Sequence, residues 1–225
     1  MAIVSSMGNQ GARAYGFTSG VKSDVSASPA GSAEKTSYGS YVILTFTSTG
    51  TLELAGPGGS VDVCLVGGGS NGAPAGNGGA GGSMLVTSTT LTAPIPVVIG
   101  GSATATTAGP LSSSNGTAGG SGGVAWSGAG GSGNSNSYRN GSAQTYGGGG
   151  GAGGLDGASG GAGGAGGGGP GGTSSDGSAG SPNTGGGGGG GAYRQKVGYT
   201  PAASWNGGSG GTGIAIFRFP SDKFK

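Results

Sequence analysis

The chain has 225 residues, of which 65 are glycine, and its nine basic and seven acidic residues leave a formal net charge of +2. This near-neutral charge argues against nucleic acid as a partner, because neutralising phosphates requires a basic stripe. The chain has no histidine, which excludes Ser-His-Asp and Cys-His catalysis and histidine-based metal sites.

Glycine-rich composition usually indicates low complexity or disorder. Disordered segments, however, are commonly kept solvated by charge, and this chain has few charges, so we predict that it is ordered. No apolar run approaches the ~18 residues of a transmembrane helix, so membrane insertion is not expected.

Residues 1–40 are rich in Ser and Ala and have no clear periodicity. They hold several of the charges, namely Arg13, Lys22, Asp24, Glu34 and Lys35. We predict a separate N-terminal arm over 1–40 that attaches the protein to a larger assembly; the alternative is a loosely ordered tail. The start of the chain lacks the apolar stretch of a signal peptide, so none is expected.

Apolar segments typical of strands follow, bounded by glycine and proline. Residues 41–47 and 51–54 flank Ser48-Thr49-Gly50, which predicts a hairpin. In 61–66, alternate residues share a face, and Cys64 is expected to be a small buried hydrophobe. Further strands are predicted at 83–91, 95–99 and 214–219. We therefore expect a small sheet in which the last strand pairs with the first ones. No 3.6-residue periodicity occurs, so no α-helix is expected.

Glycine-rich sequence fills 67–82, 116–133, 147–172, 185–191 and 207–213. Inside Gly147–Gly191, glycine falls at every third position without a break: Gly148, Gly151, Gly154, Gly157, Gly160, Gly163, Gly166, Gly169 and Gly172. Three residues per turn is the period of the left-handed polyproline II helix, in which glycine permits close lateral approach. We predict that such helices stack through N–H···O=C bonds, and that Gly148–Gly172 forms a central, surrounded helix of this scaffold.

Non-glycine residues are then expected only on the outer surface or in turns. The interruptions at 104–117, 124–127, 134–146, 173–184 and 192–206 are predicted to be loops between the glycine helices. They contain both tryptophans, and exposed aromatic and Arg clusters are typical of binding surfaces. The predicted contact residues are Trp126, Tyr138, Arg139, Tyr193, Arg194, Tyr199 and Trp205. For each of them the alternative is packing against the stacked glycine helices.

Two end segments resemble a known family. FTSTGTLELAGPGGSVDVCLVGGG (46–69) resembles the entry segment of the glycine-rich domain of bacteriophage tail-fibre and tail-tip adhesins. GGSGGTGIAIFRF (207–219) resembles the closing strand of that domain. The resemblance covers 41–219 and implies a sandwich of polyglycine II helices, as in the distal adhesin of T-even-type long tail fibres, with loops that recognise the host. Residues 1–40 are shorter than the fibre-binding domain of those adhesins.

The fold expected is thus irregular and all-β: a small sheet framing polyglycine II helices over 41–219, with a C-terminal tail at 220–225. Asp156 and Asp176 are isolated carboxylates, and no catalytic residue, metal site or cofactor is predicted. The resemblance implies a non-catalytic virion protein, a tail-fibre tip or receptor-binding adhesin, that binds a host surface glycan or outer-membrane protein. It would contact other virion proteins through 1–40, and a homotrimer fits the threefold symmetry common in fibres. The alternative is a structural decoration protein of a capsid or tail, or a self-assembling surface fibre.

Overall fold

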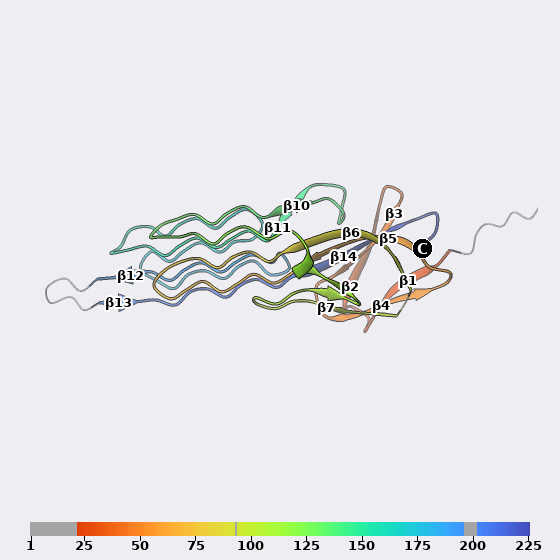
Figure 1. Ribbon diagram of the computed structural model, residues 1–225, viewed down its shortest axis with the longest axis horizontal. Helices are drawn as coiled ribbons and strands as arrows, with labels where there is room; N and C mark the ends of the chain where they lie inside the picture. Colours follow the sequence, from red (N-terminus) through yellow and green to blue (C-terminus); the bar gives the residue numbers. More distant parts are fainter. Residues whose placement is uncertain (1–21, 93, 196–201) are drawn as a thin grey trace, which may run out of the picture.

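The computed structural model describes residues 22–92, 94–195 and 202–225. The molecule is elongated, with β-sheets at one end and a slab of extended glycine-rich segments running away from them (Figure 1). The described residues contain β-strands, one 3-10 helix at Ser113–Asn115 and no α-helix. The predicted all-β, irregular fold class is therefore confirmed.

The first sheet is antiparallel, and β14 lies at its centre between β3 and β5. Phe217 of β14 faces Leu44 on one side and Val63 on the other, so the last strand closes against early ones as predicted. The strands in spatial order are β2 (Ala33–Tyr38), β3 (Tyr41–Phe46), β14 (Ile214–Pro220), β5 (Gly59–Val66) and β6 (Met84–Leu91).

The second sheet packs against one face of the first through an apolar core. In that core Phe46 meets Phe217 edge to face, with ring centroids 5.7 Å apart. Alternation in β5 sends Val61, Val63 and Leu65 into this core. The strands of the second sheet in spatial order are β1 (Asp24–Ser28), β4 (Gly50–Ala55), β7 (Ile95–Val98), β8 (Thr107–Ala108) and β9 (Leu111–Ser112).

The hairpin predicted through Ser48-Thr49-Gly50 is wrong. β3 pairs with β2 and β14, whereas β4 pairs with β1 and β7 in the other sheet. The connection crosses from one sheet to the other. Both strands send apolar side chains into the same core from opposite sides, so their sequence pattern cannot distinguish a hairpin from a crossing.

The predicted boundaries at 40 and 220 fall within the sheets. β2 pairs with β3 from Ala33↔Phe46 to Tyr38↔Tyr41, so residue 40 lies in the turn of that hairpin. The segment 220–225 is likewise held in place, because Phe224 is buried in the core. Residues 1–21 of the predicted arm lie outside the described residues, and attachment through them stays a prediction.

The glycine-rich runs form extended segments, here called rods, that alternate in direction between the sheets and the far end of the molecule, here called the distal end (Figure 1). In chain order they are rod A (67–73), B (78–83), C (116–123), D (128–133), E (147–154), F (160–165), G (168–172), H (177–181), I (185–192) and J (205–213). The predicted loop at 173–184 therefore contains a rod, H, between two turns.

Hydrogen bonds between rods repeat every three residues. The amides of Gly148, Gly151 and Gly154 donate to the carbonyls of Gly166, Gly169 and Gly172 respectively, at 2.8–3.0 Å. The amides one position further along rod E donate to rod D. Of the next ones, that of Gly150 donates to rod B and that of Gly153 donates to Gly76, which precedes rod B. This is the pattern that three residues per turn requires. The left-handed polyglycine II geometry of the rods stays a prediction.

Rods E and I are the interior of the slab, and every residue of 147–154 and 185–192 is buried. Hydrogen bonds link rod E to rods B, C, D, F, G and I, and they link rod I to rods A, B, E, G, H and J. The remaining rods bond to one another in the order A, B, C, D, F, G, H, J and back to A, which closes a ring around the two inner rods. The slab is therefore a hexagonal array with two filled centres.

The prediction that Gly148–Gly172 forms one central helix is wrong. The chain reverses at Gly157 and again at Gly166, both with positive φ, and only rod E of the three resulting rods is central. The triplet spacing survives the turns because successive rods are neighbours. A Cβ at Gly151 would lie 2.0 Å from a carbonyl oxygen of rod F, one at Gly160 2.2 Å from rod G, and one at Gly169 2.2 Å from rod H.

Outer rods tolerate a small residue at every third position, facing solvent. Ala129, Ala162 and Ser209 are examples, and all three are exposed. The inner rods hold two exceptions to the expectation that non-glycine residues lie outside: Ala152 and Ala192 are fully buried. Both lie near the distal end, where the array opens into turns.

Candidate functional site

The predicted contact residues separate into two groups at opposite ends of the slab. Trp126, Tyr193, Arg194 and Trp205 lie at the distal end, whereas Tyr138 and Arg139 lie against the first sheet. Tyr199 lies outside the described residues. The described distal segments between rods are 74–77, 124–127, 155–159, 173–176, 193–195 and 202–204.

Trp126 and Tyr193 form a stacked pair at the distal end, with ring centroids 5.9 Å apart and planes inclined by 20°. They come from different turns. The Trp126 turn is fixed by positive φ at Ala125 and Ser127, and the amide of Ser127 donates to the carbonyl of Gly153 at 3.1 Å. Trp126 remains 39% exposed, so the stack presents apolar surface to solvent.

Tyr193 and Arg194 form the short strand β12 (Tyr193–Arg194), which pairs with β13 (Ala203–Ser204) beyond the end of the slab. Arg194 is exposed. Trp205 is half-buried, and its backbone joins rod I to the turn 74–77. Its amide donates to the Ala192 carbonyl and its carbonyl accepts from the Ala75 amide, both at 3.0 Å. We name Trp126, Tyr193, Arg194 and Trp205 the tip cluster.

Two carboxylates that looked isolated in the sequence secure this end. Asp156 accepts a hydrogen bond from the Gln195 amide at 2.7 Å, and its own amide donates to the Tyr193 carbonyl at 2.9 Å. Asp176 accepts from the Asn206 amide at 2.8 Å. Each therefore joins a neighbouring turn to one strand of the β12–β13 ribbon. A rough signal was present, since both occur in turn-like Ser/Gly contexts.

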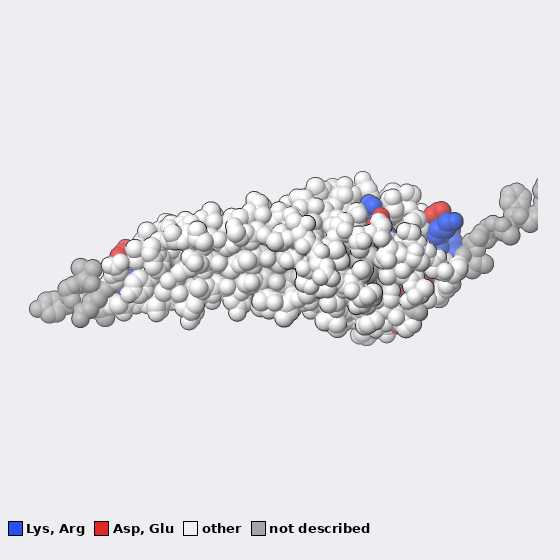
Figure 2. Space-filling model, in the orientation of Figure 1, with Lys and Arg blue, Asp and Glu red and all other residues white. Residues whose placement is uncertain are grey.

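Among the described residues, charged side chains lie only toward the two ends of the molecule (Figure 2). Figure 2 shows acidic and basic atoms at the distal end and at the sheet end, with an uncharged surface between them. The rods themselves carry no Lys, Arg, Asp or Glu within the described residues. The slab thus separates two chemically distinct ends by a stretch of small, neutral residues.

Tyr138 belongs to the packing of the sheet end. It sits in the loop between β10 (Asn134–Asn136) and β11 (Gln144–Tyr146), a hairpin that packs over the outer face of the first sheet. The guanidinium of Arg218 lies 4.0 Å from the Tyr138 ring centroid and 4.3 Å from that of Tyr41. Arg218 also donates to Asp62 Oδ2 at 2.7 and 3.0 Å. Burial and the Asp62 charge raise the pKa of Tyr138.

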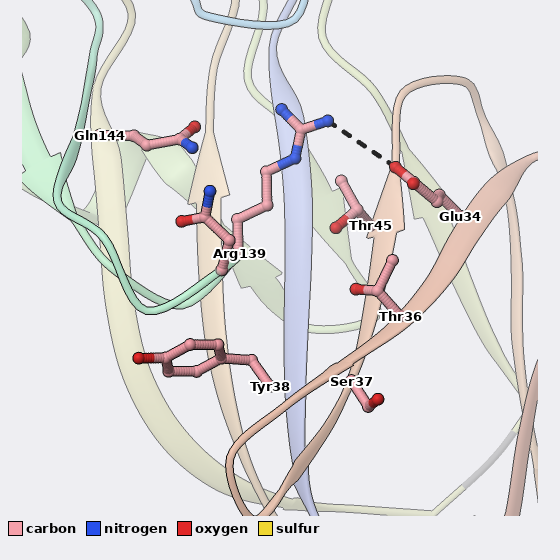
Figure 3. Close-up of a pocket in the computed structure, with 8 residues that line it drawn as sticks. Glu34, Thr36, Ser37, Tyr38, Thr45, Arg139 and Gln144 are labelled. Atoms are coloured by element: carbon pink, nitrogen blue, oxygen red, sulfur yellow. Dashed lines mark ion pairs between the residues drawn. The ribbon is translucent and has the colours of Figure 1, made fainter.

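Arg139, next in the loop, points to the edge strand β2, where its Nη2 lies 3.8 Å from Glu34 Oε2 (Figure 3). Between the loop and β2 is an open cleft of about 290 Å³, also lined by Tyr38, Thr45 and Gln144. We call it the basal cleft. The sequence did not indicate it, because β2 was assigned to the N-terminal arm.

No group of His, Cys, Asp and Glu residues suited to a metal ion occurs within the described residues. Nor does any helix in that part of the chain have the length and apolar character needed to cross a membrane. Comparison of the chain with protein-family models, with curated proteins and with solved structures gave no match. The resemblance to tail-fibre adhesins therefore stays a prediction.

Proposed function

We propose that this chain is a non-catalytic bacteriophage virion protein, a tail-fibre tip or receptor-binding adhesin, that binds the host surface through its distal end. The supporting observation is the tip cluster, in which Trp126 stacks on Tyr193 and remains partly exposed, while Arg194, the next residue of β12, is exposed. Aromatic and arginine side chains contribute most of the binding energy at typical protein interfaces.

The slab suits this role because it is a stiff spacer. A rod of eight residues spans ~25 Å at 3.1 Å per residue, and hydrogen bonds join each inner rod to the rods around it. The side chains on its surface are small and uncharged, so it offers few groups that a ligand could bind. Loops carried on a rigid scaffold lose less conformational entropy on binding than loops on a flexible one.

The end segments that resemble tail-fibre adhesins meet in one place. Residues 61–66 and 214–219 lie in neighbouring strands, β5 and β14. β5 leads directly into rod A, and rod J leads directly into β14. In this proposal the sheet end is the base of the adhesin, and other virion proteins are contacted through residues 1–40. The receptor is a surface glycan or an outer-membrane protein.

The test is binding of fluorescently labelled protein to a panel of Gram-negative strains. Binding to a subset of strains is expected, and a Trp126→Ala, Arg194→Ala double variant should lose it. Ala162→Ser, on an exposed outer-rod position, is the matched control and should bind as the parent does. Equal binding by the double variant, or binding to no strain, would overturn the proposal. Polymerisation of the purified chain would instead favour the structural alternative.

A further inference from the structure

The basal cleft lies at the sheet end of the molecule, remote from the tip cluster. Its floor is the first sheet, one wall is the edge strand β2, and the other wall is the loop 137–144 (Figure 3). Its volume of about 290 Å³ is near the lower end of the range for small-molecule pockets, ~300–1,000 Å³.

The walls are fixed in place without a ligand. The loop is anchored by Arg218 stacking on Tyr138 and by the Tyr138 amide, which donates to Asn136 Oδ1 at 2.8 Å. Gly141 lies against the Tyr38 ring so closely that a Cβ there would be 2.0 Å from a ring carbon. Glycine is required at this position, where φ is +80°. A preformed site avoids the entropic cost of ordering its walls.

The floor of the cleft contributes one hydroxyl group. Thr45 is 2% exposed and lines the cleft, and its hydroxyl can both donate and accept a hydrogen bond.

The rim combines opposite charges with an amide and an aromatic ring. The side chains of Glu34 and Arg139 are 64% and 38% exposed, and their 3.8 Å separation is loose for an ion pair. Their charges compensate, which disfavours a charged ligand. The carboxylate accepts, the guanidinium donates and the Gln144 amide does both, while Tyr38 is 54% exposed. Closely spaced hydroxyl groups on a ligand with an apolar face would engage this set.

We propose that the basal cleft is a saccharide-binding site for one or two neutral sugar residues of a glycan. Glu34, Arg139 and Gln144 hydrogen-bond the sugar hydroxyls, Tyr38 contacts an apolar face of the ring, and the Thr45 hydroxyl bonds a group that enters deepest. This site is independent of the distal receptor site, because the whole slab separates the two. An experiment can therefore refute sugar binding at the base without refuting the proposed function of the tip, and the reverse also holds.

The test is titration of the isotope-labelled protein with methyl glycosides of glucose, galactose, mannose and N-acetylglucosamine, followed by amide NMR. At least one glycoside should shift the amides of Tyr38, Gly141 and Gln144. Thr45→Val and Gln144→Ala should each weaken binding about fivefold or more, the loss expected for one hydrogen bond. A well-dispersed spectrum of each variant verifies its fold.

Ala162→Ser, on an exposed outer-rod position outside both sites, is the control and should leave the titration unchanged. Shifts confined to the tip cluster would overturn the cleft site while leaving the tip proposal intact. Failure of every glycoside to shift cleft amides would overturn it, as would equal affinity in folded Thr45→Val and Gln144→Ala.

Discussion

The amide of Gly151 donates to the carbonyl of Gly169 at 2.9 Å, and the carbonyl of Gly151 accepts from Gly190 at 2.8 Å. One residue of an inner rod thereby joins two neighbouring rods. Repeated every three residues, this arrangement satisfies the backbone of a chain that has few side chains to bury. Glycine is needed at positions such as Gly151, because a Cβ there would lie 2.0 Å from a carbonyl oxygen of the neighbouring rod.

The first prediction concerns the inner rods. A Cβ at Gly150 would lie 2.0 Å from the carbonyl oxygen of Gly188, so Gly150→Ala must push two inner rods apart. We expect destabilisation of ~3 kcal/mol or more, the upper part of the range for overpacking. Ala162→Val, on an exposed outer position, should change the free energy of unfolding by less than ~0.5 kcal/mol. Denaturant titration measures both, and equal stabilities would contradict the array.

A second prediction compares a rod with a turn. A side chain at Gly160 meets the Gly171 carbonyl oxygen at 2.2 Å, whereas Ser175 is exposed in a distal turn. Gly160→Val should therefore lower the midpoint of thermal unfolding far more than Ser175→Val does. Calorimetry of the two variants decides the matter. A similar fall in both would show that rods F and G do not pack as closely as described.

The sequence indicated the three-residue period, because most outer rods repeat two glycines and one small residue, as in rods B, D and F, and the glycines face other rods. It also held the identity of the inner rods. A rod with rods on all sides needs glycine at all three positions, and the uninterrupted glycine runs 147–151 and 185–191 lie in rods E and I. The longer triplet spacing from Gly148 to Gly172 does not mark an inner rod. It arises because the successive rods E, F and G are neighbours and each needs glycine where it faces the next.

Which end a loop occupies depends on how many times the chain has reversed before it. Rods C and D run out and back, which places 134–146, with Tyr138 and Arg139, at the sheet end. Trp126 lies at the distal reversal between them. From the sequence, Trp126, Tyr138 and Arg139 were all predicted to contact a receptor, because each occurs in an interruption of the glycine runs that is rich in aromatic and polar residues. The exposed edge strand β2 was missed because none of its residues is buried, so no alternation marks it.

The third prediction concerns acid stability. Burial raises the pKa of Asp62, but hydrogen bonds from Ser88 and Arg218 and the Arg218 charge outweigh it, so the pKa lies below its ordinary value of 3.8. Because the pKa is lower in the folded than in the unfolded protein, the ionised carboxylate stabilises the fold fully above the unfolded-state pKa. This stabilisation is lost as the pH falls through the folded-state pKa.

Asp62→Asn should therefore cost about 1–3 kcal/mol at neutral pH, as for hydrogen bonds to a charged group. The difference between variant and parent should shrink once the pH falls below 3.8. Asp222→Asn, an exposed position, is the control. Denaturant unfolding as a function of pH measures the effect, and a difference that stayed constant with pH would contradict the assignment.

The fourth prediction concerns Cys64, which is fully buried in β5 between β14 and β6, as expected from its apolar surroundings. Burial raises the pKa of its thiol to about 12, so little of the reactive thiolate exists near neutral pH. Ellman's reagent should react only as the protein unfolds, at a rate that rises with denaturant. Immediate stoichiometric reaction of the native protein would contradict the burial.

The last prediction concerns the stack of Trp126 on Tyr193, which joins two distal turns through side chains alone. Such a pair contributes ~0.5–1.5 kcal/mol beyond the area that it buries. A double-mutant cycle of Trp126→Ala and Tyr193→Ala should return a coupling free energy in that range, measured by denaturant unfolding. Because both residues lie beyond the end of the slab, each single variant should keep the parent's cooperative transition, whereas binding to cells should fall in both.

A cycle with zero coupling would show that the rings do not pack in solution. Retained cell binding in the double variant would show that the stack only fastens the turns, and the receptor contacts would then have to lie elsewhere on the molecule.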